Sequence, residues 1–83
     1  MIDINTKISD LNLPIRVVNC LYLAEVDTVR DLCKTKRSHL LRQRNFGQRS
    51  IAVVDAFLNS HCLTYNMTDD TLEMYESFFD NNA

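Results

Sequence analysis

The chain has 83 residues, of which 46% are hydrophobic and 24% are charged, and its formal net charge at pH 7 is −2. This length allows one small domain, and no apolar run reaches the roughly 18 to 20 residues that a membrane-spanning helix requires. One glycine and one proline are too few turn residues for a β-rich domain, so the composition predicts a mostly helical, soluble protein.

The first predicted helix follows a lead-in at residues 1–9 and a short turn or extended piece. Pro14 suits the first turn of a helix, which continues from there to about Leu23. Three apolar residues of this helix point toward the core: Val17, Val18 and Leu21. A second face carries residues at spacings i, i+3, i+4 and i+7: Arg16, Asn19, Cys20 and Leu23.

Two shorter helices are predicted next. Asp27 or Thr28 can cap the first of them, which contains Val29, Leu32 and Cys33. The second begins near Thr35 or Ser38. Leu40 and Leu41 of this helix are expected to point toward the core. Arg42 and Arg44, which follow, are expected to point toward solvent.

The most regular helical pattern follows Gly47, the only glycine of the sequence. We expect a positive φ or a close backbone approach at this residue. A helix begins at Gln48 and extends to about His61, with apolar residues at positions 51, 54, 57 and 58. Its first amides point out beside Arg49 and Ser50, which makes this helix start a candidate anion site, with a nucleic-acid phosphate as the expected anion. The simpler alternative is an ordinary connection in which the glycine only caps the helix.

The last predicted helix extends from Thr68 to about Phe79, after a packed strap that includes Leu63 and Tyr65. It carries its large apolar residues at helical spacing: Leu72, Tyr75, Phe78 and Phe79. The elements together predict an all-α fold, a compact bundle of four to five short helices. We divide the sequence into the lead-in, a main domain at residues 10–67 and an acidic C-terminal helix at residues 68–83.

The small net charge conceals a strong polarity along the sequence. Residues 30–49 hold seven basic residues and one acidic residue, a net charge of +6. Residues 50–83 hold six acidic residues and neither lysine nor arginine, a net charge of −6. This polarity is typical of a basic centre that meets a polyanion or an acidic partner, although a solvated surface is the simpler alternative.

No pattern indicates catalysis, so we expect a protein that is not an enzyme and that holds no metal or other cofactor. Gly47 has no partner glycine for a phosphate-binding loop, and His39 and His61 are isolated. The cysteines match no zinc spacing, which favours reduced thiols: Cys20, Cys33 and Cys62. The first residues lack the basic start and apolar stretch of a signal peptide, so we expect a cytoplasmic protein without membrane contact.

Several pieces of the sequence have an order and spacing known from one family. They are residues 10–21, Val29-Arg30-Asp31-Leu32, Leu40-Leu41, residues 45–51 and Leu63-Thr64-Tyr65-Asn66-Met67. Together they resemble the C-terminal domain of the bacterial RNA polymerase alpha subunit, over about residues 8–67. The pieces Arg-x-x-Asn-Cys-Leu and Asn-Phe-Gly-x-Arg-Ser are specific in combination.

The resemblance implies a small SAM-like bundle, related to helix-hairpin-helix folds, that binds the minor groove of A/T-rich promoter DNA. It also implies contacts with RNA polymerase, sigma factor and transcription regulators. Arg16 matches the arginine that enters the groove, with Asn19 beside it and Cys20 at the edge of the DNA face. Gly47 and Ser50 match phosphate contacts at a helix start, and Arg49 keeps the charge of a usual lysine.

The sequence departs from the family pattern at four positions. Gln48 replaces a usual basic residue, Val53 a common acidic one, Asn12 an acidic residue of the sigma-facing patch and Asn66 a glycine. These changes put the contacts with sigma and activators in doubt. The family's N-terminal dimerisation domain has no counterpart here, so we expect either a freestanding regulator, which Met1 favours, or the promoter-reading part of a polymerase subunit.

Two classes of function stay open. The first is a DNA-binding transcription module. The second is a protein-interaction module that binds polymerase, sigma or a transcription factor without productive DNA contact. The acidic C-terminal helix has three possible roles: it completes the core, it folds over the basic region, or it presents aromatic residues to a partner. Completion of the core is the simplest of these.

Overall fold

The computed structural model describes residues 1–82, which form one short 3-10 helix and five α-helices. In chain order these are η1 (Ile8–Asp10), α1 (Ile15–Leu23), α2 (Val29–Lys34), α3 (Arg37–Leu41), α4 (Gln48–Ser60) and α5 (Asp69–Asn82). The only extended pairing in this part of the protein is an isolated antiparallel bridge between Lys7 and Thr28. The all-α prediction is therefore confirmed. None of the helices in the described range is long and apolar enough to cross a membrane.

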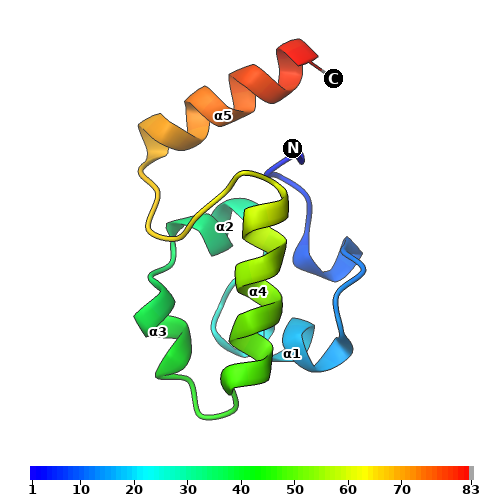
Figure 1. Cartoon of the computed structure of the whole chain (residues 1–83), viewed down its shortest axis with the longest axis vertical. Helices are drawn as coiled ribbons and strands as arrows, with labels where there is room; N and C mark the ends of the chain where they lie inside the picture. The colour runs from blue at the N-terminus through cyan, green and yellow to red at the C-terminus, as the bar shows by residue number, and fades with distance from the viewer. Residues whose placement is uncertain (83) are drawn as a thin grey trace.

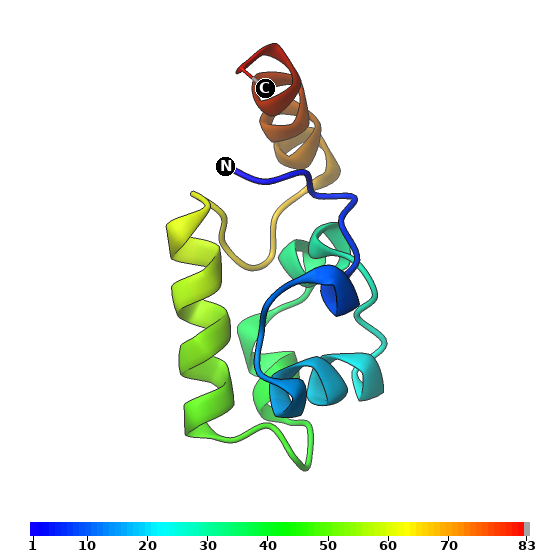
Figure 2. The same ribbon diagram turned by 90° about the vertical axis from the view of Figure 1, so that its right-hand side faces the viewer.

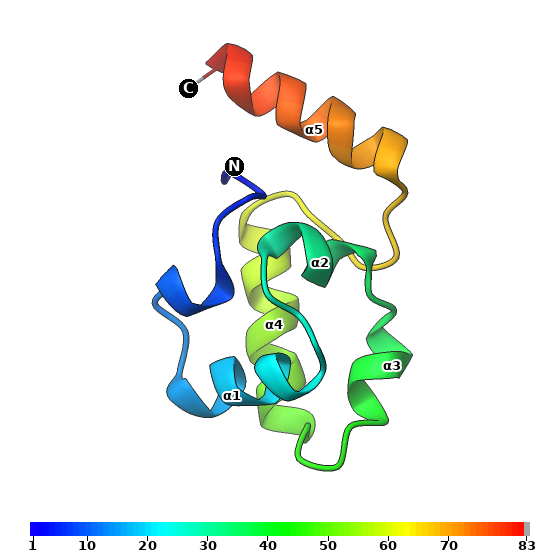
Figure 3. The same cartoon turned by 180° about the vertical axis from the view of Figure 1, so that it is seen from behind.

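The helices of the main body lie on two sides of one core (Figures 1 and 2). In Figure 2, α4 stands on one side, and α1, α2 and α3 lie on the other. The start of α4 meets α1 at one end of the molecule, whereas α5 lies across the opposite end, close to the N-terminus (Figure 3). The longest dimension of the molecule, 38 Å, separates these two ends.

The core draws apolar side chains from every helix and from the segment that precedes α1. Its largest fully buried members include Ile4, Leu21, Leu32, Leu40, Ile51, Leu58 and Leu72. The prediction that Leu41 points inward is wrong, because Leu41 is 37% exposed. Consecutive helical residues lie about 100° apart, so a helix as short as α3 buries Leu40 and turns its neighbour toward solvent. Burial of Ile4 makes the first residues part of the same core.

Three residues other than glycine have left-handed backbone angles, with φ of 63°, 59° and 56°: Glu25, Cys62 and Asn66. Glu25 and Cys62 follow α1 and α4. The residue after each of them donates its amide to the carbonyl five positions earlier, at 2.9 and 2.8 Å, which is the Schellman pattern of a helix end. Asn66 stands where the resemblance expects a glycine, and asparagine tolerates this conformation better than most residues.

One face of α5 packs against the rest of the molecule. Leu72 is fully buried, and the hydroxyl of Tyr75 donates to the carbonyl of His61 at 2.7 Å and accepts from the amide of Ile2 at 3.0 Å. Two ion pairs join the same helix to α2, at 3.2 and 2.9 Å: Arg30–Glu76 and Lys34–Asp69. The acidic helix therefore completes the core, as the simplest of its three expected roles requires.

Candidate nucleic-acid interface

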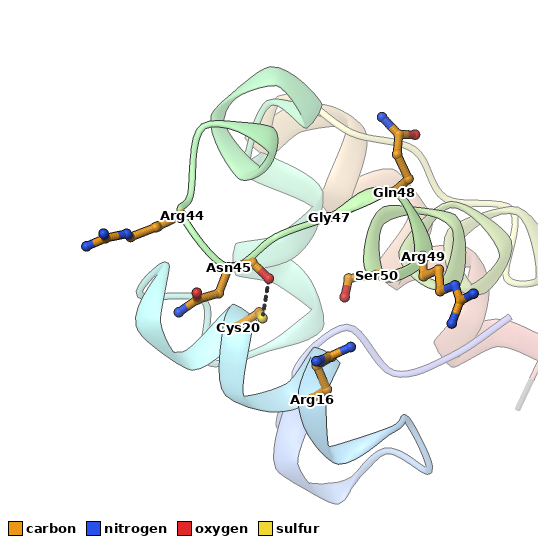
Figure 4. A pocket seen from close by; sticks show the side chains of 8 residues that line it. All are labelled: Arg16, Cys20, Arg44, Asn45, Gly47, Gln48, Arg49 and Ser50. Atoms are coloured by element: carbon orange, nitrogen blue, oxygen red, sulfur yellow. Dashed lines mark hydrogen bonds between the residues drawn. The ribbon is translucent and has the colours of Figure 1, made fainter.

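A hollow of about 460 Å³ lies where the start of α4 faces α1 (Figure 4). Its lining is polar and basic: Arg16, Cys20, Arg44, Asn45, Gly47, Gln48, Arg49 and Ser50. In Figure 4, Arg16 and Arg49 border the space that leads to Ser50, whereas Arg44 and Gln48 extend away from it. Guanidinium groups from two different helices thus border one concave surface.

The loop before α4 is held against α1 by Cys20. This cysteine is buried, and its Sγ donates a hydrogen bond to the carbonyl oxygen of Asn45 at 3.2 Å. A thiol is a weak donor, so the contact orients the loop more than it stabilises the fold. Because Arg16 lies one helical turn before Cys20, the same contact sets the position of Arg16 relative to the start of α4.

The start of α4 presents backbone amides to the hollow. The amide of Ile51 donates to the carbonyl of Gly47 at 3.0 Å, so the helical ladder begins there and the amides of residues 48–50 have no acceptor within the helix. These amides and the helix dipole favour an anion. Ser50 is buried at the inner wall, only 5% exposed.

Gly47 does not have the positive φ that the sequence led us to expect. Its backbone is extended, with φ −94° and ψ −176°, and it caps α4. A Cβ atom placed on Gly47 has no heavy atom of the described residues within 4 Å. Neither the backbone angles nor internal packing therefore requires glycine here. Two explanations remain for this glycine: its place as the N-cap of α4, where glycine is favoured, and close approach of a ligand from outside.

The arginines around the hollow lack partners within residues 1–82. Elsewhere, basic residues of the central segment pair with acidic residues of the C-terminal half: Arg30–Glu76, Lys34–Asp69 and Arg37–Asp55. Arg16, Arg44 and Arg49 form no ion pair and no side-chain hydrogen bond in the described part of the protein. Positive charge without an internal partner therefore gathers where α1 meets α4.

The structure brings five of the six sequence-predicted site residues to this hollow: Arg16, Cys20, Gly47, Arg49 and Ser50. Asn19 is exposed on α1 and does not line it. Sequence reasoning missed Arg44, Asn45 and Gln48 as site residues. The basic segment already contained Arg44, but only the fold of the loop shows which of its cations face α1.

Comparison with known proteins places this protein among transcription proteins. The family model that describes the C-terminal domain of the bacterial RNA polymerase alpha subunit matches residues 2–60. The DNA-directed RNA polymerase subunit alpha of Chlorobium limicola is 44% identical over 63 residues, which are 76% of this sequence and 19% of that protein. The same subunit of Porphyromonas gingivalis is 41% identical over 64 residues, 77% of this sequence and 19% of that protein. The 83 residues thus span about a fifth of the length of these relatives.

Proposed function

Because this protein belongs to the family of C-terminal domains of the bacterial RNA polymerase alpha subunit, we propose that it is a DNA-binding module of transcription. Its DNA site is the hollow between α1 and α4, and its target is the minor groove of A/T-rich duplex DNA. The role is one of binding, and we assign the protein no catalytic step. Its partners are DNA and, through the family relation, RNA polymerase.

Different residues contact the minor groove and the phosphate backbone of the DNA. Arg16 enters the minor groove, with Asn19 beside it, and the amides from Gly47 to Ser50 hold a phosphate of the adjoining backbone. Arg49 adds a second cation at the phosphate. A narrow A/T minor groove concentrates negative potential, and a guanidinium loses its water more readily than an ammonium group. This arrangement reads groove width more than base identity.

One observation supports this proposal above the others: the three arginines at the hollow lack internal partners, whereas Arg30, Lys34 and Arg37 of the basic segment are paired. Lys36 and Arg42 of that segment also form no ion pair within residues 1–82, but they do not line the hollow. Unpaired like charges on one surface repel each other and contribute nothing to folding. They suit a surface that receives an anion. A duplex phosphate backbone is long enough to meet cations from both helices at once.

The test is the fluorescence anisotropy of a labelled A/T-tract duplex and of a G/C-rich duplex, each at two salt concentrations. We expect preference for the A/T duplex and weaker binding at higher salt. Arg16→Ala should lower the affinity for the A/T duplex by about 1–3 kcal/mol. Arg42→Ala removes an exposed arginine that does not line the hollow and should change the affinity far less.

A second candidate function is a protein-interaction module without productive DNA contact. Exposed apolar side chains on α1 favour it: Ile15, Tyr22 and Leu23 are 73%, 78% and 65% exposed. Equal and negligible binding of both duplexes by the folded protein would reject the DNA proposal and favour this second function.

A further inference from the structure

The outward face of α5 combines exposed apolar side chains with carboxylates. This open surface is formed by Asp70, Glu73, Met74, Ser77, Phe78 and Asn81. Met74 is 73% exposed and Phe78 is 59% exposed, one helical turn apart. This helix lies beyond residues 2–60, the part of the sequence that the family model matches. The helix also lies at the opposite end of the molecule from α1 and the start of α4 (Figure 3).

The carboxylates of α5 divide into two sets according to their partners. On the inward side, Asp69 pairs with Lys34 and Glu76 pairs with Arg30. Asp70 and Glu73 on the outward side, and Asp80 near the end of the helix, are exposed and form no ion pair within residues 1–82. Cations of the protein itself therefore match only the inner set.

Helix electrostatics explain only part of this pattern. Asp70 lies in the first turn of α5, where the helix dipole favours a negative charge. Asp80 lies near the C-terminal end, where the dipole disfavours one, and the last turn contains no basic residue. No cation of the described residues pairs with these exposed carboxylates, so positively charged groups that match them would come from another molecule.

We infer that the outward face of α5 binds a basic, amphipathic helical segment of another protein. Apolar residues of that segment cover Met74 and Phe78, and its lysines or arginines lie beside Asp70 and Glu73. A second copy of α5 is a poor occupant, because it would bring like charges together. The inference goes beyond DNA binding, and a partner held here leaves the hollow free.

The test is a titration of the 83-residue protein with a synthetic amphipathic peptide of leucine and lysine, monitored by the amide NMR spectrum of the protein. A matched peptide with glutamate in place of lysine is the control. We expect shifts confined to α5 with the lysine peptide, binding that weakens with salt, and no binding of the glutamate peptide.

Three single substitutions test whether the lysine peptide binds at the outward face of α5. Glu73→Lys should weaken lysine-peptide binding by roughly fivefold, and Met74→Ser by roughly tenfold. Asp10→Lys makes the same change of charge at an exposed residue far from α5 in sequence and should leave the affinity unchanged. Both α5 side chains are exposed, so these variants retain the core.

Two results would overturn the inference. The first is equal loss of binding in Asp10→Lys and Glu73→Lys, which would mean attraction by net charge alone. The second is sedimentation of the 83-residue protein as a dimer that Met74→Ser converts to a monomer, which would make a second copy the occupant. No DNA is present in these measurements, so failure here is distinct from failure of DNA binding.

Discussion

Arg16 on α1 and Arg49 on α4 border one hollow, and no carboxylate of the described residues pairs with either of them. Proximity of like charges costs folding free energy, so this arrangement favours binding at the expense of stability. Gly47, between the two helices, has open space around it. At the scale of the residue, the candidate site is therefore defined by arginines that form no ion pair within the described residues and by a glycine that internal packing does not require.

Gly47→Ala tests that conclusion directly. The extended backbone accepts alanine, and its Cβ meets nothing inside the protein, so the free energy of unfolding should change by no more than about 0.5 kcal/mol. Affinity for the A/T duplex should fall by about fivefold or more, because the added methyl group stands where a phosphate approaches. Thermal unfolding and anisotropy measure the two quantities. Asn59→Ala, at an exposed residue of α4 that does not line the hollow, is the control, and unchanged affinity in Gly47→Ala would contradict the phosphate contact.

Asp55 ties α3, α4 and the strap after α4 together. Arg37 donates to its carboxylate at 3.1 and 2.9 Å, and the hydroxyl of Tyr65 donates at 2.6 Å. These hydrogen bonds, that of Arg37 first, hold the pKa of Asp55 below its ordinary value of 3.8. A lowered folded-state pKa contributes stability above the unfolded pKa, and this stability is lost as pH falls through the folded value.

Asp55→Asn should therefore lower the free energy of unfolding at pH 7 by up to about 1 kcal/mol, since both charged partners are partly exposed. The difference from the unmodified protein should shrink below about pH 4, where the carboxylate begins to lose its charge. Thermal unfolding measured across this pH range checks the prediction. Asp10→Asn serves as control, and a difference that stays constant down to pH ~2 would rule out the carboxylate as its source.

At the scale of the element, the helices are short, so their stability depends on how the backbone groups at their ends are capped. Thr28 and Asp31 form a capping box that begins α2, in which each side chain accepts from the backbone of the other. In contrast, α1 and α4 end with Glu25 and Cys62 in left-handed conformations that glycine adopts at less cost. The start of α2 is thus supported by side chains, whereas the starts of α1, α3 and α4 have no side-chain cap and the ends of α1 and α4 retain strain.

Cys62→Gly should stabilise the protein by about 1 kcal/mol, because it relieves the left-handed strain at an exposed residue. Ala56→Gly, at an exposed position inside α4, should destabilise by about 1 kcal/mol through lost helix propensity. Opposite signs of the two changes in melting temperature are the expected result. A fall in both variants would show that the conformation at Cys62 carries no strain.

At the scale of the whole molecule, the net charge of −2 is the sum of a basic end and an acidic end. Arginines without internal partners line the hollow, and α5 lies at the opposite end of the molecule from the start of α4. The acidic helix covers only the start of the basic region, where it pairs with Arg30 and Lys34, and none of its residues lines the hollow. Charges this far apart are screened at physiological salt, where the Debye length is about 8 Å.

Removal of residues 68–83 should consequently leave the affinity for the A/T duplex within about twofold at ~0.15 M salt. The same truncation should lower the melting temperature, because the buried Leu72 leaves the core. Anisotropy below the melting temperature of the truncated protein, with circular dichroism as the folding control, measures both effects. A large gain in affinity would show instead that α5 inhibits DNA binding.

Much of the architecture was predictable because it depends on local rules. Apolar spacing located the helices, and Thr28 and Gly47 marked the starts of α2 and α4. Leu41 was placed wrongly because sequence spacing does not tell how much of a short helix the core reaches. The division of the sequence at residues 10 and 68 remains a prediction, although Ile4 and Leu72 on either side contribute to one core.

The sequence by itself determined the fold class, the family and the residue types of the candidate site, since these depend on periodicity and on motifs of fixed spacing. Tertiary structure alone decided which cations are paired and which border the hollow: Arg30 pairs with Glu76, whereas Arg49 has no partner within the described residues and borders the hollow. It also decided that Met74 and Phe78 lie outward on α5 while Leu72 is buried. Charge pairing and exposure depend on contacts between residues distant in the sequence, and no local pattern specifies those contacts.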